Sequence, residues 1–150
     1  MKTIDTRTIG CDGSTPASLH AVIREAWSNL CESAVDRREM EIEEAAGEYF
    51  SDEQWGVTDH FWLNAHEALV KAFHSLAVLA LFSLNRDCRE GFDFEFRQDP
   101  GIAFDYIGEM NGVVVLGHEG SDRTYEDCEI PASQMKRIAD RLMKALEDLN

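Results

Sequence analysis

Three side chains in the second half of the chain have the types needed for acid–base or metal chemistry: Glu95, Asp105 and His118. Two carboxylates and an imidazole can hold a divalent cation or act as a general acid and base. No second histidine stands near them in the sequence, so we favour a structural charge cluster over a metal site. A small metal-dependent enzyme or ligand-binding protein that uses these three residues stays as an alternative.

The other candidates for chemistry are weaker. His66 and His74 share one face of a predicted helix but lie about 12 Å apart along its axis, too far to hold one metal without ligands from elsewhere. Ser121 follows two glycines, but the segment is neither GxSxG nor a phosphate-binding loop. The four cysteines are scattered and form no CxxC pair, which indicates reduced thiols in a cytosolic protein. We therefore expect a non-catalytic protein with no cofactor and no metal.

Two long helices are predicted in the first half of the chain. Ser14-Thr15-Pro16 is typical of a helix start, with a hydroxyl cap followed by proline near the first helical position. An apolar stripe then runs from residue 19 to 30 and continues more thinly through residues 34, 35, 42, 45 and 49. This pattern predicts one helix over 16–50, with a bend rather than a break near Asp36. A capping box at 51–54, or a second possible cap at Thr58 just after Gly56, begins a central helix that ends at residue 84. This helix is apolar nearly all round near its end, so it should be buried on most sides.

The pattern then changes to a period of two, which predicts an antiparallel meander. Alternating phenylalanines at 92–96 indicate a strand, Asp99-Pro100-Gly101 a turn and residues 102–110 a second strand. Asn111-Gly112 predicts a hairpin into a third strand over 113–119, and residues 124–130 are a candidate fourth strand. Pro131 begins a last helix. The fold expected for residues 1–150 is a single α+β domain with N-terminal helices, a three- to four-stranded antiparallel meander and a C-terminal helix.

The two turns also predict which strand residues face each other. A two-residue hairpin loop pairs Ile107 with Leu116. A three-residue loop at 99–101 pairs Glu95 with Asp105 and places the phenylalanines on the face that packs on the helices. The opposite face then carries acids together with Ile107 and Leu116, which indicates an interface, unless the last helix covers that face.

Charge points to a class of partner. The 150 residues carry a formal charge of -15, which makes direct binding of nucleic acid through its phosphates improbable. Eight acids against two arginines give residues 36–54 a net charge of -6, and residues 87–129 carry twelve acids against three bases. Such clustering indicates an electronegative surface for a basic partner. The candidate partner-binding residues are Glu39, Glu43, Glu44, Asp52, Glu53, Trp55, Asp93, Glu95, Asp105, Ile107, Glu109 and Leu116.

These observations favour a non-catalytic acidic protein that blocks a basic surface on a protein or protein complex. Immunity proteins against nucleic-acid-cleaving toxins and small phage-encoded inhibitors of host defence complexes have this profile of charge and size, and a stricter version is nucleic-acid mimicry. A structural subunit that homodimerises through the apolar part of its sheet is a further alternative. No signal-peptide core and no uninterrupted apolar span is evident, so we expect a cytoplasmic location without membrane contact.

Overall fold

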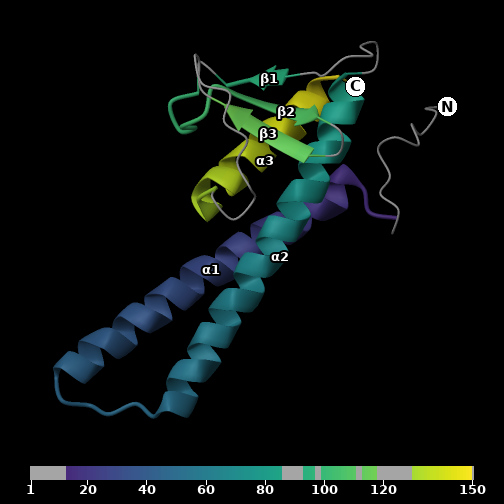
Figure 1. Ribbon diagram of the computed structural model, residues 1–150. Coiled ribbons are helices and arrows are strands. Elements are labelled where there is room, and N and C mark those ends of the chain that lie inside the picture. The colour runs from purple at the N-terminus through teal and green to yellow at the C-terminus, as the bar shows by residue number, and fades with distance from the viewer. Residues whose placement is uncertain (1–12, 86–92, 97–98, 111–112, 118–129, 150) are drawn as a thin grey trace.

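The computed structural model describes residues 13–85, 93–96, 99–110, 113–117 and 130–149. Its elements are, in chain order, α1 (Pro16–Ala45), α2 (Asp52–Leu84), β1 (Asp93–Glu95), β2 (Tyr106–Met110), β3 (Val113–Gly117) and α3 (Ala132–Asp148). Figure 1 shows the sheet and α3 gathered at one end of the long α1–α2 pair. The predicted α+β layout is confirmed. The candidate fourth strand lies outside the described residues, apart from Ile130.

Helix α1 begins where the sequence predicts. The Ser18 N–H donates to Thr15 Oγ1 at 3.2 Å and the Thr15 N–H donates to Ser18 Oγ at 2.9 Å, which closes a capping box ahead of Pro16. The helix is unbroken to Ala45 and ends before Gly47, whose φ of +101° lies in the left-handed region that favours glycine. It therefore stops short of the predicted end at residue 50.

Helix α2 is the central element of the core. The hydroxyl of Ser51 accepts from the Gln54 N–H at 3.2 Å, as predicted, and the helix ends at Leu84. Leu69, Phe73 and Leu76 are fully buried, in agreement with the apolar surface that the sequence shows on this segment. By length and composition alone α2 is long and apolar enough to cross a membrane, a test that the buried core helix of a globular protein also passes.

The sheet has the order β1-β2-β3 with antiparallel neighbours. The hairpin register is confirmed, because Met110 pairs with Val113 and Ile107 pairs with Leu116. The register predicted between the first two strands is wrong by one residue, since Glu95 pairs with Tyr106 and not with Asp105. The cause is the connection between β1 and β2, which is longer than the predicted three-residue loop and irregular. Its turns are closed by hydrogen bonds from the Asp99 N–H to the Phe96 carbonyl and from the Ile102 N–H to the Asp99 carbonyl.

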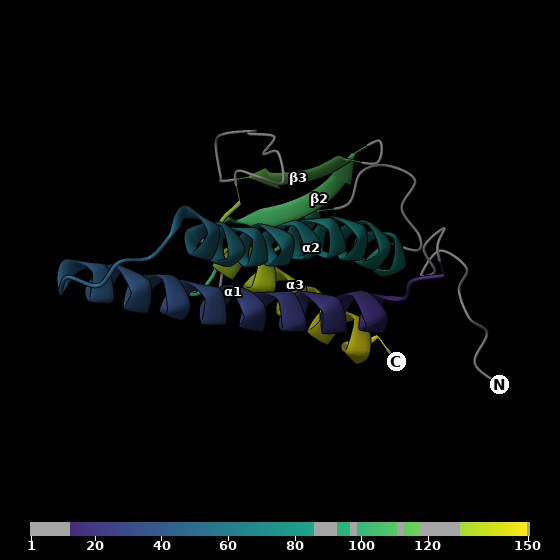
Figure 2. The same ribbon diagram turned by 90° about the horizontal axis from the view of Figure 1, so that it is seen from below.

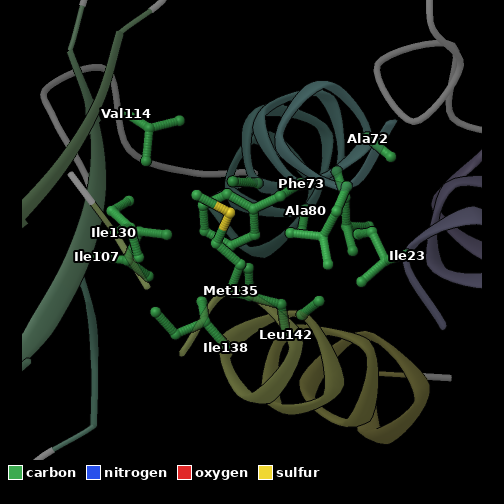
Figure 3. Packing of buried hydrophobic residues seen from close by; sticks show 14 of the residues in the cluster. Ile23, Ala72, Phe73, Ala80, Ile107, Val114, Ile130, Met135, Ile138 and Leu142 are labelled. Carbon is green, nitrogen blue, oxygen red and sulfur yellow. The ribbon is translucent and has the colours of Figure 1, made fainter. Parts of the chain in front are cut away.

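That shift reverses the predicted faces of β2 and β3, because a one-residue slip moves every side chain to the other face. Ile107 and Leu116 are 0% exposed and face the helices, so the prediction that they lie on an exposed interface is wrong. Figure 3 shows Ile107 and Val114 turned toward Phe73 of α2 and Ile138 of α3. Helices cover this face, as the alternative interpretation required.

The core lies between the sheet, α2 and α3, with α1 closing the far side. In Figure 3, Met135 and Leu142 of α3 and Ile23 of α1 point into the same interior as Phe73. Gln134 also ties α3 to the chain before β2, because its Oε1 accepts from the Ala103 N–H at 2.9 Å and its Nε2 donates to the Gly101 carbonyl at 3.2 Å. The buried apolar layer therefore occupies one end of the molecule.

Candidate protein-binding surface

The α1–α2 pair extends well beyond this core. The last buried apolar residue of α1 is Leu30 and the first of α2 is Ala65. We call the intervening residues 31–64 the arm. Figures 1 and 2 show from two directions that the arm passes the end of the sheet and of α3. Neither the sheet nor α3 therefore covers the arm.

Contacts between side chains hold the two helices of the arm together. Met40 Sδ accepts from Thr58 Oγ1 at 3.3 Å, and Arg37 lies 3.4 Å from Asp59 without hydrogen-bond geometry. Near the turn, Trp55 Nε1 donates to Glu44 Oε1 at 2.9 Å. Because such partly exposed polar pairs contribute at most about 1 kcal/mol each, the arm contributes far less to stability than the apolar core does.

The seam between the helices differs from the stripe that the sequence predicts. Residues 34, 35, 42 and 45 were expected to continue the buried stripe of the first helix, but all four are exposed. Ser33 is buried, and Arg37 and Met40 contact Asp59 and Thr58 of α2. These three positions continue the three- and four-residue spacing of the buried residues before them. Because Ser33 and Arg37 are polar, a search for apolar periodicity does not detect these positions.

The arm carries a dense negative charge on its exterior. All eight carboxylates between residues 36 and 54 are exposed: Asp36, Glu39, Glu41, Glu43, Glu44, Glu48, Asp52 and Glu53. Within the same stretch the bases are Arg37, which faces Asp59, and Arg38. The net charge of -6 is therefore presented to solvent and is not neutralised within the arm.

Exposed apolar side chains gather on the same part of the molecule. Six of the nine exposed large hydrophobic residues in the described chain belong to the arm: Val35, Ile42, Tyr49, Val57, Phe61 and Leu63. Val35 and Ile42 are seven residues apart and so share one face of α1, where they are 55% and 59% exposed. Val57 and Phe61 are four apart and share a face of α2. Apolar surface that is rimmed by charge is typical of an interaction site.

The structure places six of the predicted partner-binding residues on the arm. Glu39, Glu43, Glu44, Asp52 and Glu53 are all exposed on it. The sixth, Trp55, is half-buried, because its indole donates to Glu44 and its ring packs edge-on against Phe50 with centroids 6.3 Å apart. Trp55 therefore helps to hold the turn of the arm.

The predicted sheet-side residues do not form one surface. Glu95 is exposed, whereas Asp105 and Glu109 are half-buried and have interactions of their own. Glu109 lies on the helix-facing side of β2, opposite the buried Val114. Ile107 and Leu116 are inside the core and cannot contact a partner or a second copy of the chain. The backbone of Asp93 pairs with Gly108, and the Asp93 side chain is not among those that the structure describes.

The residues considered for chemistry give no assembled site. His118 and Ser121 lie outside the described residues, so the predicted cluster with Glu95 and Asp105 has no complete geometry. Among the residues that the structure describes, no group of three histidine, cysteine or acidic side chains is placed to hold a metal. His66 stacks on Trp62 with ring centroids 5.2 Å apart, which gives it a packing role.

A polar cluster that sequence reasoning missed joins α1 to α3. Asp140 lies 2.7 Å from His20 Nε2 through one oxygen and 2.6 Å from Lys136 Nζ through the other. Partial burial on its own would raise the pKa of the Asp140 carboxyl, but hydrogen bonds and attraction from Lys136 and His20 outweigh it and hold the pKa below its ordinary value of 3.8. Only the Lys136–Asp140 spacing is visible in the sequence, because His20 is 120 residues away.

This cluster predicts a dependence of stability on pH. Because the pKa of Asp140 is lower in the folded chain, its ion pairs stabilise the fold above pH 3.8 and lose that contribution as the pH falls through the lowered value. The free energy of unfolding of Asp140→Asn should therefore lie below that of the native chain by up to about 1 kcal/mol near pH 6, and the gap should close as the pH falls below 3.8 and through the lowered pKa. Urea titrations across this range measure it. Asp148→Asn, at the exposed end of the same helix, is the control, and an equal gap for both variants contradicts the assignment.

Comparison of the chain with protein-family models, with curated proteins and with solved structures finds no match. The described residues define an α+β protein from which an acidic, partly apolar helical arm projects.

Proposed function

We propose that this chain is a non-catalytic binding protein that docks its acidic arm onto a basic surface of another protein. The observation that carries the proposal is the arm itself. It combines eight exposed carboxylates with six exposed large apolar side chains in a segment that the core does not enclose. Self-repulsion among these carboxylates lowers stability, so a role outside the fold is the simplest account of their concentration.

The two kinds of side chain would do different work at an interface. Opposite charge speeds the encounter of two proteins and orients them, while a few desolvated apolar anchors supply most of the affinity. Ile42 and Phe61 are the anchors we expect, because each is a large apolar side chain that is exposed on the arm. The partner should therefore present arginines and lysines around an apolar depression.

A more specific form of this proposal is that the chain blocks a protein that acts on nucleic acid. Glu32, Asp36, Glu39 and Glu43 recur every three or four residues along α1 and are all exposed. A helix rises about 1.5 Å per residue, so these four carboxylates form a row roughly 16 Å long. A row of this kind can occupy a surface that binds phosphates, as an immunity protein or a phage-encoded inhibitor of a nucleic-acid-acting complex does.

Capture of partners with a matched pair of variants tests the proposal. The native chain, a Glu39→Lys/Glu43→Lys variant and a Glu147→Lys/Asp148→Lys variant would each be immobilised and exposed to lysate of the source organism. Both variants reverse two exposed acids near a helix C-terminus, so they change net charge equally. A basic protein retained by the native chain and by the α3 variant, but lost by the arm variant, is the expected result. Capture only of acidic proteins, or capture that the arm variant retains in full, contradicts the proposal.

A further inference from the structure

Helix α3 and the segment before β2 form an open groove that is separate from the arm. Its volume is about 900 Å³, and its lining includes Glu95, Asp99, Ile102, Arg137, Arg141 and Lys144. Arg137, Arg141 and Lys144 occupy one side of α3 at spacings of four and three residues. Three basic side chains therefore line one groove in a chain whose net charge is -15.

The walls of the groove are fixed by hydrogen bonds. The Arg141 Nε donates to Asp99 Oδ2 at 2.7 Å, and its guanidinium lies over the Phe94 ring at 5.5 Å from the centroid. Gln134 holds the irregular backbone before β2 through its hydrogen bonds to Gly101 and Ala103. A groove held in this way needs little rearrangement to accept a ligand, which favours binding.

Two of the cations in the groove are available to a ligand. Asp99 is engaged by Arg141, and Asp140, which also lines the groove, is engaged by Lys136 and His20. Arg137 and Lys144 have no ion pair with a carboxylate of the described chain. Three carboxylates line the groove as well, those of Glu95, Asp99 and Asp140, and among them Glu95 is the one that no described cation pairs with.

Gly101 leaves the space in which the guanidinium of Arg137 lies. The guanidinium crosses Gly101 so closely that a Cβ at that position would collide with Nη1. The backbone at Gly101 therefore leaves room for the guanidinium and positions it beside the groove. A larger residue at position 101 would move Arg137 without changing any charge.

We propose that this groove binds a nucleotide-sized organic phosphate, with its phosphates held by Arg137 and Lys144. One guanidinium group can donate two parallel hydrogen bonds to the oxygens of a phosphate, and the ammonium group of a lysine adds a second positive charge. The half-buried Ile102 offers an apolar surface for the organic part. The volume lies in the range of about 300–1,000 Å³ that is usual for small-molecule sites. This site is independent of the function proposed for the arm.

Isothermal titration calorimetry with ATP, at low ionic strength and without divalent metal, tests the site in the full chain. The expected result is one-to-one binding that Arg137→Ala and Lys144→Ala each weaken at least about tenfold. Lys71→Ala is the control, because it removes an exposed cation of α2 outside the groove and should leave the affinity unchanged. Gly101→Ala should also weaken binding, by less than Arg137→Ala does, because it displaces the guanidinium but leaves its charge in place. Thermal unfolding of each variant establishes that it is folded.

Three results would overturn the proposal. They are the absence of ATP binding by the native chain, an equal loss of affinity in Lys71→Ala, and full affinity in Arg137→Ala. Citrate, a carboxylate anion, serves as the comparison ligand, and binding of citrate as tight as that of ATP would overturn the assignment to phosphate.

Discussion

Replacement of Leu116 by glutamate is expected to remove most of the free energy of unfolding. Leu116 is 0% exposed and pairs with Ile107 on the face of the sheet that packs on the helices. Loss of a buried leucine costs about 2–5 kcal/mol, and the new carboxyl group must in addition be desolvated or neutralised. The sum is at least about 4 kcal/mol, against a total stability of about 5–15 kcal/mol for a typical protein. Urea denaturation followed by circular dichroism measures the loss.

Leu63→Glu makes the same chemical change at an exposed position. Leu63 is 55% exposed on the arm, so its replacement should change the free energy of unfolding by no more than about 0.5 kcal/mol. A loss for Leu116→Glu as small as that expected for Leu63→Glu would contradict the burial of Leu116 in the core. If Leu116→Glu stayed folded and instead dissociated a dimer, Leu116 would lie on an exposed face of the sheet. The observed register excludes that arrangement.

The sheet shows where inference from the sequence succeeds and where it stops. The alternation around Phe94 and the Asn111-Gly112 signal predicted strands and a hairpin register that the structure confirms. The faces of β2 and β3 depended on the length of the connection between β1 and β2, which was taken as a three-residue turn. Because side chains alternate with a period of two, an error of one residue in that connection moved Ile107 and Leu116 from the core to the surface.

The helices show a similar limit. Hydroxyl groups at Thr15 and Ser51 predicted both helix starts, because capping is a local interaction that the sequence displays directly. The arm was not predictable, since its existence depends on where α3 and the sheet stop along the α1–α2 pair. Val35 and Ile42 could be assigned to the surface only once that boundary was known. The predicted acidic residues of the arm nevertheless came together, because they are close in sequence as well as in space.

Reversal of charge on the arm should slow association with the captured basic partner by about tenfold at low salt. Glu39 and Glu43 are exposed carboxylates one helical turn apart, so Glu39→Lys/Glu43→Lys replaces attraction by repulsion during the encounter. The dissociation rate should change much less, because the apolar anchors that hold the complex are untouched. Stopped-flow or surface-based kinetics would separate the two rates. The fold should tolerate the change, because both side chains are exposed and surface substitutions usually change stability by no more than about 0.5 kcal/mol.

Salt and a second variant distinguish steering by the arm from a general effect of charge. Added salt shortens the screening length from about 10 Å at 0.1 M to about 3 Å at 1 M, so the native and arm-reversed chains should associate at similar rates in high salt. Glu147→Lys/Asp148→Lys alters net charge equally but lies at the end of α3, and it should slow association much less. Phe61→Ala should act in the opposite sense, by raising the dissociation rate while leaving association nearly unchanged, because it removes an exposed apolar side chain and no charge. If the α3 variant slows association as much as the arm variant, net charge and not the arm steers the encounter.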